Sequence, residues 1–258
     1  MAYELYLEKL TEKLQQAART QGDRILAAAQ ALADCIASGG KVWTFGCGHS
    51  ALLAQDLYYR AGGLVPVECI FGAELLLHRR PVSLTSQFER LEGYAHLLLE
   101  GSKAKAGDVI IVISTSGINV VPVEMALLAR QRGLKVIGLT SVSYSAGQPS
   151  RHPSGKKLAD AADVILDNGA DPGDGVVALP GLEQKLGPVS TAIGSALLQA
   201  VVVETAAQLL ERGIKPPIFM SANAPGGEEH NVRLLRQYEQ SGQERPEGPG
   251  FCPDQPAS

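Results

Sequence analysis

The middle of the chain reads Val109-Ile110-Ile111-Val112-Ile113-Ser114-Thr115-Ser116-Gly117-Ile118-Asn119, an apolar run that ends in a polar turn. Five successive β-branched residues predict a strand that is buried on both faces, because a half-exposed strand would alternate apolar and polar residues. Apolar residues then recur at helical spacing over residues 120–132. This order of strand, turn and helix is the repeating unit of a parallel sheet covered by helices.

The same unit recurs on both sides of this stretch. We predict further strands at residues 42–45, 64–70, 136–139 and 164–166, and helices at 51–61, 89–103, 156–161 and 189–212. Polar stretches at 79–87 and 143–154 predict loops. The expected fold is a three-layer α/β/α sandwich around a five-stranded parallel sheet with the flavodoxin-like strand order. We predict a helical N-terminal extension at 1–38, broken near Gly22, one domain at 39–240 and a disordered tail at 241–258.

The composition and net charge argue against several classes of function. Of the 258 residues, 45% are hydrophobic and 19% are charged, as in an ordinary globular protein. The net charge of −4, without a basic cluster, argues against a nucleic-acid partner. We find neither an uninterrupted apolar run of about 18 residues nor a signal peptide, so we predict no membrane partner and a cytoplasmic location. The four cysteines have no metal-type spacing, and we predict neither a metal nor a cofactor.

Two turns stand out as candidate ligand contacts. In a doubly wound sheet, ligands bind beyond the carboxyl ends of the strands, where the strand order reverses. With the flavodoxin-like order, that place lies between the first and third strands, which lead into Gly46-Cys47-Gly48-His49-Ser50 and Ser114-Thr115-Ser116-Gly117-Ile118-Asn119. Both turns are rich in hydroxyls and open a helix, so backbone amides and hydroxyls can converge on an anion. Neither contains Lys or Arg, and the nucleotide P-loop motif is absent. A phosphate monoester of a small polar molecule fits this pattern.

A dinucleotide site is an alternative interpretation of the first turn. Residues 46–51 fit the relaxed Gly-x-Gly-x-x-Gly/Ala fingerprint, and Glu68 follows at the spacing of a ribose-binding acid. An NAD-dependent dehydrogenase is therefore a second hypothesis. It leaves the hydroxyl-rich turn at 114–119 without a role.

These turns, together with Gly187-Pro188-Val189-Ser190-Thr191, resemble the SIS (sugar isomerase) domain family of phosphosugar-binding proteins over residues 41–210. The resemblance is closest to uncharacterised bacterial sugar isomerases of this family. It implies that Ser114, Thr115, Ser116 and Asn119 surround the phosphate, that Ser50 completes the cradle, and that the chain forms a homodimer or a higher oligomer. Asn119 stands where many members have Thr. Gly48, Ser190 and Glu183 are further candidates for substrate binding.

A secondary similarity to the N-acetylmuramic acid 6-phosphate etherases rests on Glu89-Arg90-Leu91-Glu92-Gly93 and on the block from Ser221 to Asn231. It makes Glu92 or Glu89 a candidate for proton transfer. Heptose-phosphate isomerases and etherases also use a Glu about ten residues after the first turn. Here residues 56–60 contain none, so neither mechanism carries over directly.

Isomerisation and ether elimination both need acids and bases near the strand ends. We expect Glu74, Glu92 and His230 to share proton transfer, with His230 able to act from a partner subunit, and His49 to assist at the sugar. The expected function is aldose–ketose isomerisation of a phosphorylated sugar. An amino-sugar phosphate lyase or etherase and a non-catalytic phosphosugar sensor remain open alternatives.

Overall fold

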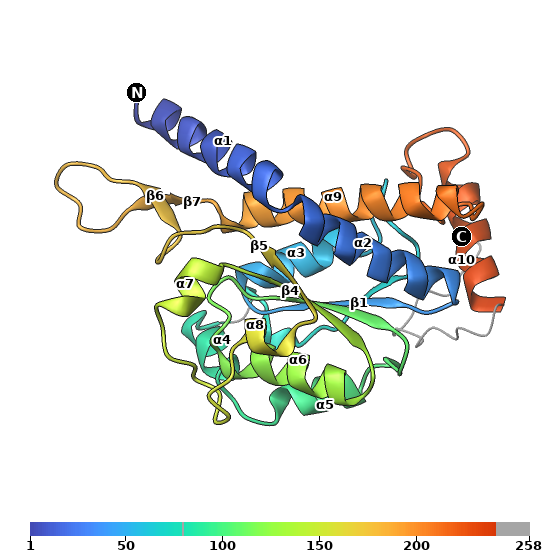
Figure 1. Ribbon diagram of the computed structural model, residues 1–258, viewed down its shortest axis with the longest axis horizontal. Helices are drawn as coiled ribbons and strands as arrows, with labels where there is room; N and C mark the ends of the chain where they lie inside the picture. The colour runs from blue at the N-terminus through green and yellow to red at the C-terminus, as the bar shows by residue number, and fades with distance from the viewer. Residues whose placement is uncertain (79, 241–258) are drawn as a thin grey trace, which may run out of the picture.

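The computed structural model describes residues 1–78 and 80–240 (Figure 1). Five parallel strands form the central sheet in the order β2-β1-β3-β4-β5. Their bounds are β1 Val42–Gly46, β2 Val67–Cys69, β3 Val109–Ile113, β4 Lys135–Thr140 and β5 Val164–Asp167. Both the predicted α/β class and the flavodoxin-like order are confirmed.

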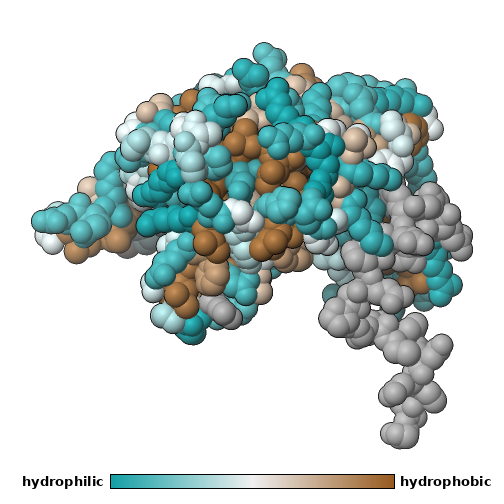
Figure 2. Space-filling model, turned by 90° about the horizontal axis from the view of Figure 1, so that it is seen from below, coloured by the Kyte–Doolittle hydropathy of each residue, from teal (hydrophilic) through white to brown (hydrophobic). Residues whose placement is uncertain are grey.

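Helices cover both faces of the sheet, which gives the predicted three layers. Successive side chains of β3 point to opposite faces, so Ile111 joins one core and Ile110 joins the other. One face packs against α2 (Gly22–Ala37), α3 (His49–Leu57) and α9 (Ser190–Glu211). The opposite face packs against α5 (Tyr94–Glu100), α6 (Val120–Gln131) and α8 (Leu158–Ala161). Seen from the α5–α6 side, the surface is mainly hydrophilic, with apolar residues gathered near the middle of the view (Figure 2).

The N-terminal segment forms two helices, α1 (Ala2–Thr20) and α2, which meet at Gln21 next to the predicted break. The side chain of Gln21 accepts a hydrogen bond from Asp167 N and thereby ties this junction to the end of β5. Only Ala17 of α1 is buried, whereas α2 contributes much of one core. The packing is therefore continuous across residue 38, where we expected the extension to end. In Figure 1, α1 projects from the sandwich beside the hairpin of β6 (Gly175–Val177) and β7 (Leu186–Pro188).

Several boundaries differ from the predicted ones. The predicted strand at 64–70 is shortened to β2 because Pro66 has no N–H to donate, and Leu64 instead forms an isolated bridge with Ile218. The predicted loops at 79–87 and 143–154 contain the short helices α4 (Ser83–Phe88) and α7 (Val142–Ala146), and a 3₁₀ turn spans Ala73–Leu75. The predicted disordered tail at 241–258 lies outside the described residues.

Two long helices complete the C-terminal part. By length and composition alone, α9 could cross a membrane. In the structure it packs against α2 and α3 and supplies a large part of one core. A helix that is apolar on all sides is typical of such a central position as well as of a membrane span. The last helix, α10 (Gly227–Gln240), follows a turn at Gly226.

Candidate functional site

A cavity of about 430 Å³ opens beside the carboxyl ends of the strands. It is lined by side chains from both predicted turns, from Glu89 and Tyr144, and from the segments around Asp174 and Ser190. Among the predicted site residues, the cavity brings together His49, Ser50, Ser114, Thr115, Ser116, Asn119 and Ser190.

The turn after β3 lines this cavity. Ser114 Oγ accepts a hydrogen bond from Gly117 N, 3.2 Å away, which folds the turn back on itself. Gly117 has φ +63°, and a Cβ there would lie 2.7 Å from Thr140 Oγ1. Only glycine fits this close approach without strain. The Thr115 carbonyl accepts from Ser141 N and from the Thr140 hydroxyl, so the turn is fixed to the end of β4.

The turn after β1 is equally constrained. Gly46 packs against the first turn of α3, where a Cβ would lie 2.5 Å from the Ser50 carbonyl oxygen. Gly48 has φ +56° and its N–H donates to the Leu75 carbonyl, so it shapes the turn without lining the cavity. Ser50 lies in the first turn of α3, and Ser116 lies just before α6, which begins after Asn119. Two helix N-termini and several hydroxyls therefore face one cavity, an arrangement suited to a bound anion.

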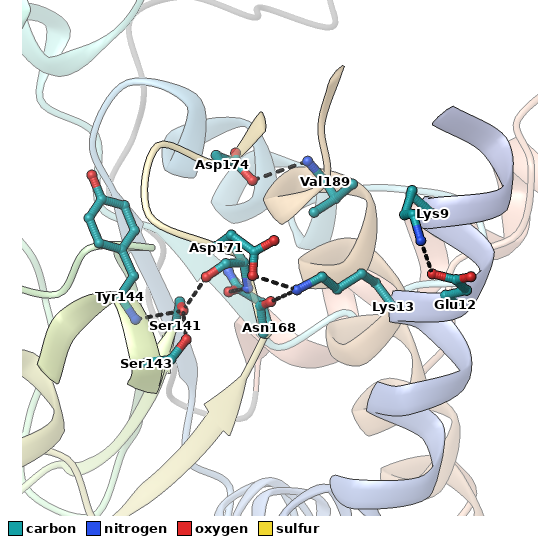
Figure 3. A network of polar contacts seen from close by, with 12 residues as sticks. Lys9, Glu12, Lys13, Ser141, Ser143, Tyr144, Asn168, Asp171, Asp174 and Val189 are labelled. Carbon is teal, nitrogen blue, oxygen red and sulfur yellow. Dashed lines mark hydrogen bonds and ion pairs between the residues drawn. The ribbon is translucent and has the colours of Figure 1, made fainter. Parts of the chain in front are cut away.

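A third wall comes from the hairpin and the start of α9. Asp174 precedes β6, and Figure 3 shows its carboxylate beside Val189 at the beginning of α9. Asp174 Oδ1 accepts hydrogen bonds from Val189 N at 3.1 Å and Ser190 N at 2.9 Å, while the Ser190 hydroxyl donates to Oδ2. This side chain therefore caps α9 from a distant loop.

Glu89 is one of the two acids that line the cavity, together with Asp174. Burial raises the pKa of its carboxyl, and a hydrogen bond with Asn119 and the charges of Arg90 and Arg151 act in the opposite direction. Arg151 Nη1 in turn donates to Asn119 Oδ1 at 2.5 Å. A carboxyl group whose pKa is raised by burial and that lines a polar cavity is suited to proton transfer.

Four predicted residues lie away from the cavity. Glu74 accepts a hydrogen bond from the Tyr94 hydroxyl at 2.5 Å, and Glu92 is exposed just before α5. Glu183 is exposed between β6 and β7. His230 lies in α10, its Nε2 3.1 Å from the Ile218 carbonyl oxygen, and lines a separate cavity of about 520 Å³ beside the end of α2.

Glu68, the acid expected to bind a ribose in a dinucleotide site, also lies away from the cavity. Glu68 lies within β2, and its carboxylate forms an ion pair of 3.2 Å with Lys41, at the amino-terminal end of β1. A ribose-binding acid belongs at the carboxyl end of the second strand. This position therefore does not support the dehydrogenase hypothesis.

Sequence reasoning did not select Tyr144 and Asp174, and it preferred Glu92 to Glu89. Tyr144 follows β4 and Asp174 follows β5. Because all five strands are parallel, the segments after the fourth and fifth strands also lie at the carboxyl edge of the sheet, and that signal was available. No group of three His, Cys, Asp or Glu side chains suited to a metal occurs in residues 1–78 and 80–240.

Comparisons with known proteins agree with this architecture. Residues 5–141 match the SIS domain. A UPF0309 protein of Shouchella clausii is 41% identical over 240 residues, which cover 92% of this chain and 97% of that protein. A UPF0309 protein of Streptomyces griseus is 44% identical, covering 84% of this chain and 87% of that protein.

Solved structures show the same fold at low sequence identity. The phosphoheptose isomerase of Neisseria gonorrhoeae superposes with a TM-score of 0.55 at 19% identity, covering 80% of this chain and 97% of that chain. A phosphoheptose isomerase from Francisella tularensis gives a TM-score of 0.54 at 18% identity, with coverages of 79% and 95%.

Proposed function

The chain belongs to the SIS domain family, and we propose that it binds a phosphorylated sugar in the cavity at the strand ends and isomerises it by proton transfer. The observation that carries this proposal is the meeting of hydroxyl groups from two helix-opening turns with the partly buried carboxyl of Glu89. An anion site and an acid–base group in one cavity are what a phosphosugar isomerase needs.

The phosphate end of the ligand belongs with the hydroxyls. Ser50, Ser114, Thr115 and Ser116 supply hydroxyl donors, and the N-termini of α3 and α6 supply favourable dipoles. Asn119 lies at the start of α6, and its side-chain oxygen accepts a hydrogen bond from Arg151, which links a cation to the cavity lining through this amide.

Proton transfer is assigned to Glu89, with His49 assisting at a sugar oxygen. In an aldose–ketose isomerisation, a base removes a proton from the carbon next to the carbonyl and returns it to the former carbonyl carbon. At the same time, the proton of the neighbouring hydroxyl moves to the former carbonyl oxygen, so the reaction needs no external oxidant or reductant. Burial raises the pKa of Glu89, which makes it a stronger base once it is ionised.

The test compares two Glu→Gln variants. Glu89→Gln is expected to retain binding of the sugar phosphate while turnover falls about 100-fold or more, the scale of general base catalysis. Glu92→Gln is the matched control, because Glu92 belongs to the same segment and is exposed outside the cavity. Binding is measured by calorimetry against hexose, heptose and N-acetylhexosamine phosphates and their unphosphorylated parents. Equal turnover in the two variants would remove Glu89 from the mechanism.

A non-catalytic phosphosugar sensor is the second candidate. It is favoured by the position of Glu74, Glu92 and His230, three of the four residues expected to move protons, outside the cavity of this chain. A sensor binds the same ligands, yet prolonged incubation leaves them unchanged. An amino-sugar phosphate lyase differs from both, since it releases a leaving group that product analysis detects.

A further inference from the structure

Asp174 has an unusual place in the cavity wall. Its backbone has φ +63°, and its two oxygens together accept three hydrogen bonds from the start of α9. A carboxylate offers about four acceptor positions, so one remains on Oδ2 for a ligand. Tyr144 and Asp174 both line the cavity, and Figure 3 shows the Asp174 carboxylate, from the segment between β5 and β6, next to Val189.

The amides at the start of α9 thus already bind a negative charge of the protein itself, the carboxylate of Asp174. Helix N-termini attract anions, and a free one in a cavity would offer a second place for a ligand phosphate or carboxylate. Here the amides of Val189 and Ser190 already donate to Asp174. The helix dipole is satisfied, and an anionic ligand group would meet a carboxylate instead of free amides.

The remaining charges of the cavity reinforce this effect. Its lining in the described part of the chain includes two carboxyl groups, Glu89 and Asp174, and one imidazole, His49, with no Lys or Arg. The two hydroxyl-rich turns, residues 46–50 and 114–119, contain neither Asp nor Glu, and they are the part suited to a phosphate. A ligand that carries a second anionic group would place it against like charge, whereas hydroxyl or amino groups would donate to Asp174.

We infer that Asp174 restricts this cavity to phosphorylated sugars whose other end carries hydroxyl or amino groups, and that it rejects those bearing a carboxylate. The inference rests on the proposed phosphosugar binding and specifies its ligand class. Asp174 is a specificity-determining residue in this account, since it acts by the charge that it presents to the ligand.

The experiment measures the affinity of the intact protein for two ligands that differ only in charge. They are N-acetylmuramic acid 6-phosphate and the derivative in which its lactyl carboxylate is a neutral carboxamide. N-acetylglucosamine 6-phosphate, which lacks the lactyl group, reports on phosphosugar binding itself. We expect the carboxamide to bind about tenfold or more tightly than the carboxylate in the wild type, and about equally in Asp174→Asn.

Asp171→Asn is the matched control. Asp171 lies three residues earlier in the same loop and pairs with Lys13 at 2.8 Å, outside the cavity lining; Figure 3 shows this pair below Asp174. The control removes the same charge, and the carboxamide preference should persist in it. A purely structural role of Asp174 in capping α9 would weaken binding of both ligands and leave their ratio unchanged.

The outcomes separate the two proposals. A wild-type ratio near one, or a ratio that persists in Asp174→Asn, overturns the role of Asp174 while binding of N-acetylglucosamine 6-phosphate upholds the phosphosugar site. Failure of all three ligands to bind overturns the proposed function and this inference with it. If Asp174→Asn does not fold, Asp174→Gly, which suits the φ of +63°, removes the charge for the same comparison.

Discussion

Glu89 shows how one partly buried carboxyl links stability to pH. Burial raises the pKa of Glu89 above its ordinary value of 4.5, so the folded state binds this proton more tightly than the unfolded chain. Its contribution to stability is therefore fully present below the unfolded pKa and is lost as pH rises through the folded pKa. Glu89→Gln removes this ionisation. We expect its free energy of unfolding to rise relative to wild type as pH increases through the region above 4.5.

Urea unfolding of the wild type and of Glu89→Gln at several pH values between about 4 and about 8 measures this difference. Glu92→Gln, at an exposed position, serves as the reference. A difference between wild type and Glu89→Gln that stays constant with pH would contradict the assigned burial effect.

Ser116 tests the phosphate end of the cavity. Its side chain lines the cavity, directly before the constrained Gly117. Ser116→Ala removes one donor to a charged group, and we expect about a tenfold or greater loss of affinity for a sugar phosphate. Ser116→Asp places a carboxylate against the phosphate and should abolish measurable binding.

Calorimetry on both Ser116 variants checks this, with Ser221→Asp as a control. Ser221 is exposed in the turn before α10 and accepts a hydrogen bond from Asn223 N, a role that Asp can also fill. Unchanged affinity in Ser116→Asp would mean that the phosphate does not lie at this turn.

The sequence predicted the two polar turns correctly as neighbours because strand order alone brings them together. Strand order also places the segment that carries Asp174 at this edge, but it does not predict the contact of the Asp174 side chain with the start of α9. Its place depends on how a distant hairpin packs against α1, where a Cβ on Gly187 would lie 2.5 Å from the Tyr6 ring. Contacts of this kind join residues about 180 positions apart and leave no periodic pattern.

At the scale of elements, the segment from Glu89 to Gly93 explains why one acid enters the cavity and the other does not. Its two ends are held by α6: Val121 N donates to the Glu89 carbonyl, and the Glu124 carboxylate accepts from Gly93 N at 2.9 Å. Glu124 also accepts from Ala95 N at 3.2 Å and so caps α5 from another helix. Glu92 lies between these anchors on the outer side.

Substitution of Glu124 tests how much this cap stabilises α5. Glu124→Ala removes the acceptor for both amides, and we expect a loss of about 1 kcal/mol in the free energy of unfolding, the usual value for a helix cap. Glu124→Gln keeps one acceptor and should lose less. Denaturant unfolding measures both variants, and equal stability of Glu124→Ala and wild type would show that the cap contributes nothing.

The hydrogen bonds of Glu124 to Gly93 N and Ala95 N also account for the largest error in the predicted helix bounds. Apolar spacing predicted one helix at 89–103, whereas α5 spans Tyr94–Glu100. Gly93 has φ +79°, which interrupts the helix, and the new start is capped from α6. Periodicity reports which face of a helix is buried, but a cap supplied by another element is visible only in the folded chain.

At the scale of the whole molecule, α1 stands apart from the sandwich that the sequence predicted. One side of α1 packs against the rest of the chain through Tyr6, Leu10 and Ala17. A second apolar stripe on α1 is exposed to 58% at Tyr3, 53% at Leu7 and 43% at Leu14. Positions three, four and seven residues apart share one helix face. The outer side of α9 adds Val203 and Leu210, which are 70% and 62% exposed.

We therefore expect a second copy of the chain to cover the exposed stripe of α1, since burying apolar surface drives stable association. Replacing Leu7 and Leu14 together by Glu should shift the protein from dimer to monomer in sedimentation experiments. Leu97→Glu is the control, because Leu97 is 67% exposed on α5, on the opposite face of the sheet. A wild-type protein that sediments as a monomer, or a double variant that remains dimeric, would contradict this assembly. Dissociation with unchanged ligand affinity would further mean that each cavity is complete within one chain, whereas lost turnover would bring a partner residue such as His230 back into the mechanism.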